Sequence, residues 1–173
     1  MKRLFLLVVF YFFFNPNEAS SQSYFKDEYQ KVWKRAANYS MAVAEAMPER
    51  HYDFKVHPQG MSFKEQQLHI VTNISFLTQL ISEEERIFYN KENMKILGKK
   101  EVMKVLKTAF RYVAELLESI KLEEVSRKIE FNNESTSKEN IFYLLRDHMT
   151  HHRGQAIIYL RLQNIEVPNY IGW

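Results

Sequence analysis

The sequence predicts an all-α four-helix bundle in a single domain. Three observations support this: 46% of the 173 residues are apolar, glycine and proline number only 4 each, and apolar residues recur at helical spacing in four long segments. A chain of this length can bury one core, and the scarcity of turn-forming residues favours long helices over many short strands. Four amphipathic helices bury their apolar faces by packing against one another.

The helices are predicted over residues 24–47, 62–89, 99–120 and 137–164. Ser62 and Glu65 form a capping box that starts the second helix, and Ser137 caps the last one. The polar stretch 121–136 between the third and fourth helices is expected to be irregular. The modest length of the connections favours an antiparallel arrangement of the bundle.

The N-terminus has the layout of a secretory signal peptide over residues 1–21. Two basic residues precede an unbroken apolar run over residues 4–14, and small residues follow before the mature domain, 22–173. This run is shorter than the roughly 20 residues that span a bilayer, so cleavage between Ser21 and Gln22 is favoured over a retained anchor. We therefore expect a secreted or periplasmic protein with no stable membrane anchor after cleavage.

Charge and cysteine content exclude some classes of function. The formal net charge is +3 and positive and negative residues are mixed along the chain, so no basic stripe for nucleic acid is expected. The chain has no cysteine, so neither disulfides nor thiolate ligands are available. Stability has to come from helix packing, and any metal ligands have to be other side chains.

The last predicted helix carries three polar residues in the middle of an apolar face. Its inward positions, spaced by four and three, are Ile141, Leu145, His148, His152, Gln155, Tyr159 and Leu162. Burying polar side chains costs free energy unless they find partners. His148 and His152 share one helix face, with Cβ atoms roughly 5–6 Å apart, and two imidazoles so placed can bind one metal ion. The alternative is a pair of hydrogen-bonded core histidines.

A third ligand has to come from another helix, and His69 is the best-placed candidate. It is the one histidine in the middle of another predicted helix, at the border of its apolar face. Three neutral imidazoles leave a fourth position on the ion open for water or substrate, which is typical of a catalytic site. A metal ion in such a site lowers the pKa of bound water or activates a bound group.

Four further residues are candidates for the surroundings of this site. His151 lies on the flank of the same helix face and is an alternative ligand, and His57 lies in a loop from which it can line an entrance. Glu65, one turn before His69, either orients that ring or only completes the capping box, which is the favoured interpretation. Gln155 either forms a hydrogen bond near the open position or satisfies a polar group in the core.

Two parts of the sequence resemble the metal-binding segments of the DinB-like (damage-inducible) proteins. Residues 54–69, which end in Glu-Gln-Gln-Leu-His, resemble the first of these segments. Residues 147–155, Asp-His-Met-Thr-His-His-Arg-Gly-Gln, with residues 160–168 after them, resemble the last helix of the family and its exit. With the order and lengths of the helices, the resemblance covers nearly all of the mature chain.

The resemblance implies a four-helix bundle with a long irregular connection and a divalent metal ion, often zinc or nickel, on three histidines. By position these are His69, His148 and His152, and His151 becomes a neighbour rather than a ligand. Enzymes similar to this family include thiol S-transferases and a thiol-dependent maleylpyruvate isomerase, and many members have no known activity. The family commonly forms dimers, so a homodimer is compatible with the resemblance.

Two functions follow as hypotheses. The first is an exported metal-dependent transferase or hydrolase that acts on a small-molecule substrate at the open coordination position. The alternative is a metal-binding or ligand-binding helical module without catalysis. Three imidazoles suit several divalent ions.

Overall fold

The computed structural model describes residues 16–171, with side chains from residue 21 onward. The four long helices are α1 (Pro16–Ala46), α2 (Phe63–Ser82), α3 (Lys99–Ser119) and α5 (Lys138–Leu162). The shorter elements are η1 (Glu49–His51), η2 (Lys91–Ile96), α4 (Leu122–Val125), β1 (Lys128–Phe131) and β2 (Glu134–Ser137). The four predicted helices are therefore present, together with a small two-stranded hairpin.

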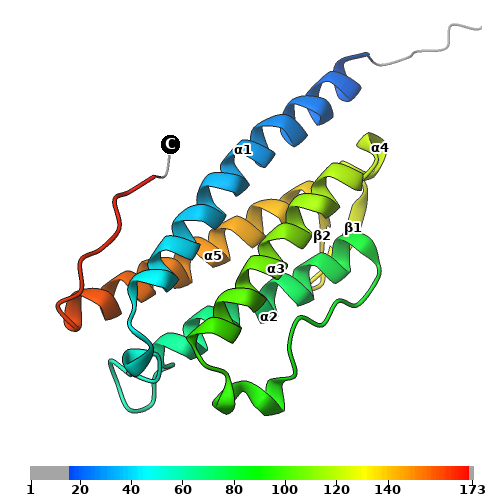
Figure 1. Cartoon of the computed structure of the whole chain (residues 1–173). Coiled ribbons are helices and arrows are strands. Elements are labelled where there is room, and N and C mark those ends of the chain that lie inside the picture. The colour runs from blue at the N-terminus through cyan, green and yellow to red at the C-terminus, as the bar shows by residue number, and fades with distance from the viewer. Residues whose placement is uncertain (1–15, 172–173) are drawn as a thin grey trace, which may run out of the picture.

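The order of the helices in space differs from a simple antiparallel bundle. Helices α1 and α2 each pack against both α3 and α5. In Figure 1, α1 and α5 run in one direction and α2 and α3 run in the opposite one. The connection over residues 83–98, which contains η2, returns the chain along the bundle before α3 begins. Because of this return, α2 and α3 are parallel neighbours, whereas α2 and α5 are antiparallel neighbours.

The first helix begins at Pro16, earlier than the predicted start at residue 24. Proline is favoured at the first helical position, where its missing N–H needs no partner. The predicted cleavage point between Ser21 and Gln22 falls inside α1, and residues 1–15 of the predicted signal peptide lie outside the described residues. The signal peptide therefore stays a prediction. Within the described part of the chain, no helix is long and apolar enough to cross a membrane.

The sequence pattern predicts that the second helix runs to residue 89, but the helix ends at Ser82. Glu83 adopts a left-handed conformation with φ of 63°, and its N–H caps the helix by donating to the Gln79 carbonyl at 2.8 Å. Three consecutive carboxylates follow Ser82, and negative charge is unfavourable at a helix C-terminus. The Glu83 carboxylate instead pairs with Arg127 at 3.1 Å and with Lys138 at 3.6 Å.

The hairpin of β1 and β2 occupies part of the stretch predicted to be irregular. Asn132 and Asn133 form its two-residue turn, and both have positive φ, 51° and 63°. Positive φ at both central positions is typical of the type I′ turn, in which asparagine is favoured. The strands pair antiparallel, with Phe131 opposite Glu134. The hairpin ends at Ser137, whose side chain then caps α5.

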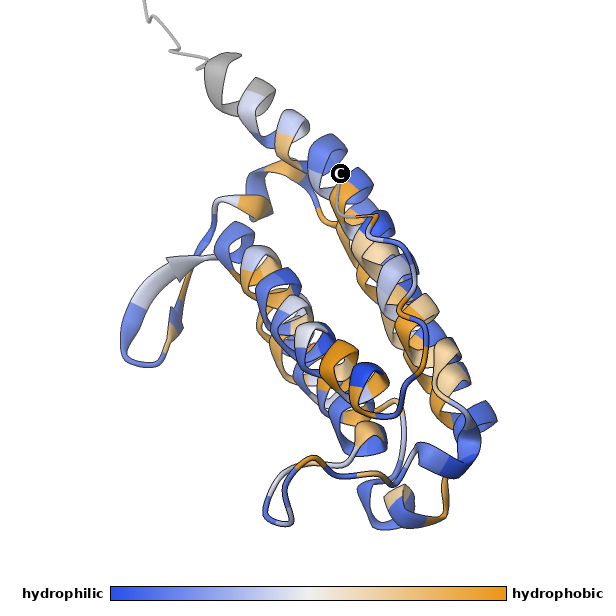
Figure 2. Cartoon of the chain, turned by 90° about the vertical axis from the view of Figure 1, so that its left-hand side faces the viewer, coloured by the Kyte–Doolittle hydropathy of each residue, from blue (hydrophilic) through white to orange (hydrophobic). Residues whose placement is uncertain are grey.

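Large aromatic side chains tie α1 to α3 and α5. Trp33, which is 2% exposed, donates from its indole Nε1 to the Phe110 carbonyl on α3 at 3.0 Å. Tyr29 donates its hydroxyl proton to the Phe142 carbonyl on α5 and packs on the Phe142 ring. Burying one such side chain contributes roughly 1.5–3 kcal/mol. Figure 2 shows polar and apolar residues alternating along the helices, as expected for amphipathic helices around a shared core.

Candidate metal centre

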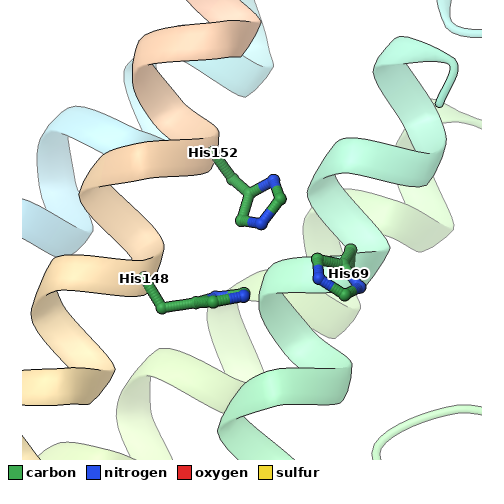
Figure 3. A group of neighbouring side chains, drawn as sticks. All are labelled: His69, His148 and His152. Atoms are coloured by element: carbon green, nitrogen blue, oxygen red, sulfur yellow. The ribbon is translucent and has the colours of Figure 1, made fainter. Parts of the chain in front are cut away.

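Three histidines from two antiparallel helices converge on one point. His69 comes from α2, and His148 and His152 come from successive turns of α5. Their ring centroids are 5.1 Å apart for His69 and His148, 4.6 Å for His69 and His152, and 4.5 Å for His148 and His152. One nitrogen of each ring lies within 4.8 Å of those of the other two. Figure 3 shows the three rings turned toward the space between the two helices.

The local sequence of α2 explains why His69 faces α5. The helix starts at a capping box in which Ser62 Oγ accepts from the Glu65 amide at 3.1 Å, and the Glu65 carboxylate accepts from the Ser62 amide at 2.6 Å. Leu68 and Ile70, on either side of His69, are 0% and 1% exposed. Their burial fixes the rotation of the helix, which leaves His69 half-buried at the border of the core.

All three imidazoles have lowered pKa values. Burial, and then the charges that His69 and His151 carry when protonated, lower the pKa of His148 to about 4. Burial, and then the charges that His148, His69 and His151 carry when protonated, lower the pKa of His152 to about 4. Burial, followed by the Lys91 ammonium, lowers the pKa of His69 from its usual value of 6.5. Neutral imidazole is the form that binds metal ions, so the cluster is ready to bind one at pH 7.

A chain of side-chain hydrogen bonds orients the His152 ring. The Gln66 carbonyl oxygen lies 2.6 Å from His152 Nδ1, and because an amide oxygen only accepts, Nδ1 carries the proton. Gln66 donates to the Gln155 carbonyl oxygen at 2.7 Å, and Gln155 Nε2 lies 2.7 Å from His151 Nε2. This network leaves Nε2 of His152 with its lone pair free, in the tautomer that a metal ligand requires.

The donor set fits a divalent ion in its chemistry, and its spacing is close to what an ion requires. His148 Nδ1 is buried and has no hydrogen-bond partner among the described residues, and an unsatisfied buried nitrogen costs about 1–3 kcal/mol. Zinc lies about 2.0–2.1 Å from a ligating nitrogen, so two nitrogens on one ion are at most about 4.2 Å apart. The ring nitrogens of His69, His148 and His152 lie within 4.8 Å of one another, so the rings need to turn slightly inward to hold the ion.

A pocket of about 280 Å³ opens beside His69. Its lining combines two methionines with polar groups, and its residues are Met61, Glu65, His69, Thr72, Tyr89, Lys91 and Met94. The Tyr89 hydroxyl lies 3.0 Å from Thr72 Oγ1, which fixes the phenol at the mouth. A larger pocket of about 660 Å³ shares Thr72, Tyr89 and Lys91 with it and continues along the 83–98 connection. A small molecule can therefore reach His69 from this side.

The structure places the residues that the sequence predicts around the site in different surroundings. Glu65 serves the capping box, as favoured from the sequence, and is 3.3 Å from Lys55 Nζ. His151 is exposed, with its ring centroid 4.9 Å from that of His152, and it lies outside the triad. His57 is exposed and accepts from the Gln59 amide at 3.2 Å within its own turn. It is not among the residues that line the pocket beside His69, and its place at an entrance stays a prediction.

Sequence reasoning missed three residues that surround the cluster. Gln66 is 4% exposed and supports His152. Its position three residues before His69 places it on the same face of α2, and this spacing is the signal that could have identified it. Tyr89 and Lys91 reach the pocket only because the 83–98 connection folds back over α2, and no local pattern indicates that course.

For the protein without metal, we expect the free energy of unfolding to fall as the pH drops from about 6.5 to about 4. In this range the unfolded histidines, with pKa near 6.5, take up protons that folded His148 and His152, with pKa about 4, do not. The stability is fully present above pH 6.5 and is lost on acidification. Urea unfolding at several pH values measures it, and the double variant His148→Gln, His152→Gln should show a flatter dependence. Equal slopes for both proteins would contradict the expectation.

Comparisons with known proteins identify a family model and similar folds. A model of the DinB family matches residues 19–170. The fold is similar to a DinB-like protein from Bacillus cereus, with a TM-score of 0.72 and 15% identity over 83% of this chain and 96% of that one. It is also similar to the DinB-like protein YjoA from Bacillus subtilis, with a TM-score of 0.68 and 21% identity over 83% of this chain and 97% of that one.

A third similar structure carries a functional description. YfiT from Bacillus subtilis is described as a probable metal-dependent hydrolase with an unusual four-helix bundle topology. It has a TM-score of 0.64 and 16% identity over 82% of this chain and 89% of that one. No curated protein matches the chain. Because the family model spans most of its length, the chain belongs to the DinB family.

Proposed function

We propose that this protein binds one divalent metal ion through His69, His148 and His152 and acts as a metal-dependent hydrolase or transferase on a small molecule. The observation that carries the proposal is the convergence of three neutral imidazoles from two helices within 4.8 Å. The description of YfiT as a probable metal-dependent hydrolase supports the same class of chemistry. Zinc or nickel is the proposed ion, because imidazole ligands suit both.

The open side of the site determines what the ion can do. A divalent ion held by three protein ligands lowers the pKa of a water in its free position or polarises a substrate group bound there. Gln66 holds the His152 ring in one orientation, with Nε2 available to the ion. The antiparallel packing of α2 on α5 holds the three rings together without disulfides.

The pocket beside His69 supplies the substrate contacts. Lys91 contributes a positive charge close enough to lower the pKa of His69, so it can hold a negatively charged substrate group near the ion. Thr72 donates its hydroxyl proton to the Leu68 carbonyl, so Tyr89 donates to Thr72 and its hydroxyl oxygen can accept a hydrogen bond from a substrate. Met61 and Met94 give the pocket apolar walls that displace water. We propose an anionic small molecule as the substrate class for these reasons.

We also propose that the protein works outside the cytoplasm. The support is the N-terminal pattern of basic residues, an apolar run over residues 4–14 and small residues before Gln22. The absence of cysteine is compatible with an oxidising compartment, where free thiols are a liability.

Elemental analysis and an activity screen test the proposed function together. The purified protein should contain one equivalent of zinc or nickel, and it should turn over an ester or thiol–electrophile substrate in a reaction that a chelator stops and added metal restores. One equivalent of metal without turnover across both substrate classes would favour the alternative, a metal-binding module without catalysis. A purified protein that neither contains nor takes up a divalent ion would exclude both.

A further inference from the structure

Three arginines line a further pocket, on the side of α5 that faces away from the histidine cluster. This pocket of about 290 Å³ lies between α1 and α5 and includes Arg35, Arg146 and Arg153 among its lining residues. Arg146, Thr150 and Arg153 are spaced by four and three, so they share one face of α5. His148 and His152 are each two residues away from members of this set, which puts them on the opposite side of the helix. The pocket is therefore separate from the proposed metal site.

Arg153 is held rigidly but keeps unused donors. It is 8% exposed, and its guanidinium donates to the Ala36 carbonyl at 3.2 Å and to Thr150 Oγ1 at 3.3 Å. Its Cζ lies 4.9 Å from the centre of the Tyr39 ring. A guanidinium has five N–H donors, so hydrogen bonds remain to be made. No carboxylate among the described residues is among the groups that shift its pKa, which burial lowers, and burying a charge without a counterion is costly.

The other two arginines add positive charge with incomplete compensation. Nε of Arg35 is buried and has no hydrogen-bond partner among the residues that the structure describes. Arg146 is bound to Asp147, with Nε and a terminal nitrogen 3.1 Å and 2.8 Å from one carboxylate oxygen. None of the described residues that line the pocket is acidic. The Asp147 carboxylate compensates one of the three guanidinium charges, so two positive charges stay uncompensated among the described residues.

The C-terminal tail forms one wall of the same pocket. Asn164, with φ of 53°, lies just past the end of α5, and Ile165 N–H donates to the Leu160 carbonyl at 2.9 Å, as in a Schellman motif. The chain then turns back, and Tyr170 packs its ring edge-to-face on Tyr39 with centroids 5.7 Å apart. The pocket is therefore bordered on three sides, by α1, by α5 and by the tail.

We propose that this pocket binds a phosphate group, either as inorganic phosphate or as a phosphomonoester. A phosphate dianion matches the two uncompensated positive charges, and its oxygens suit the planar forks of Arg35 and Arg153, which bind phosphate in a bidentate manner. The buried Nε of Arg35 and the unused donors of Arg153 become satisfied on binding. A volume of about 290 Å³ also leaves room for a small organic group attached to the phosphate.

Thermal unfolding and titration calorimetry test this inference with inorganic phosphate and glycerol phosphate, against chloride at the same ionic strength. Both phosphates should raise the melting temperature by about 2 °C or more at saturation. Arg35→Gln should weaken phosphate binding about tenfold or more, and Arg35→Lys should weaken it less. Arg111→Gln, which removes an exposed arginine on α3, serves as a charge-matched control and should bind like the parent protein.

The variants also separate this site from the metal site. Phosphate bound at the ion would be lost on addition of a chelator and would be unaffected by Arg35→Gln. Phosphate in the arginine pocket should be weakened by Arg35→Gln and unaffected by a chelator. Circular dichroism of each variant without ligand checks that it is folded. An equal response of the Arg35→Gln and Arg111→Gln variants, or an equal shift with chloride, would overturn the inference. A response to inorganic phosphate but not to glycerol phosphate would identify the free ion as the ligand.

Discussion

Replacing His148 by alanine is expected to lower the affinity for the divalent ion by more than about 100-fold. Loss of a residue that only orients a ligand already costs 10–100-fold, and this change removes a ligand itself. The two remaining rings, His69 and His152, come from different helices and form a two-ligand site. A competition titration with a chromogenic chelator, using zinc and nickel separately, measures the loss.

The same variant should be nearly as stable as the parent protein when no metal is present. His148 Nδ1 is buried without a hydrogen-bond partner, so removing the ring also removes an unsatisfied polar group. The metal-free melting temperatures should therefore be similar, while the increase caused by metal should disappear in the variant. His57→Ala, a histidine removed from an exposed turn, is the matched control and should keep the metal effect. Full metal affinity in the His148→Ala protein would refute the proposed ligand set.

The helices could be predicted from the sequence because the signals that form them are local. Apolar spacing marks the buried faces, and the capping box of Ser62 and Glu65 marks the start of α2. The end of α2 could have been placed too, because three glutamates after Ser82 oppose its dipole. Similarly, Asn132 and Asn133 between short alternating segments are a turn signal that identifies the hairpin.

The parallel pairing of α2 with α3 could not be predicted in the same way. It depends on the course of residues 83–98, which contacts between distant residues fix. The Tyr89 hydroxyl bonds to Thr72 Oγ1 at 3.0 Å, and Lys64 Nζ, on a side chain that is almost fully buried, donates to the Lys95 carbonyl at 3.1 Å. Each contact exists only after the connection has folded back, so neither leaves a periodic pattern in the sequence.

In the candidate site too, the features set within one helix could be predicted from spacing, and those that depend on the pairing of helices could not. The spacing of His148 and His152 places both rings on one face of a single helix, which local geometry dictates. The approach of His69 depends on the pairing of α2 with α5, which the family resemblance implied and the spacing alone did not. For Gln66, the spacing to His69 indicates the shared face of α2, but its hydrogen bond to His152 depends on the pairing of α2 with α5.

Replacing Gln66 by leucine is expected to lower metal affinity by 10–100-fold, although Gln66 is not proposed as a ligand. His152 loses the acceptor for its Nδ1 proton, so the ring is free to rotate and to exchange tautomers. Gln155 loses the donor to its carbonyl oxygen in the same step. The broken hydrogen bonds should also cost about 1–3 kcal/mol of stability, so metal affinity has to be measured separately from unfolding.

Gln66→Glu separates orientation of the ring from simple packing. A carboxylate at this position accepts the Nδ1 proton of His152 more strongly than an amide and makes the ring a more basic ligand, so metal affinity should equal or exceed that of the parent protein. Nitrogen NMR of His152 reads the tautomer directly: the Nδ1-protonated form should persist with glutamate and mix with the other form with leucine. If both variants bound metal equally well, Gln66 would have only a packing role, because leucine has no acceptor for that proton and glutamate has one.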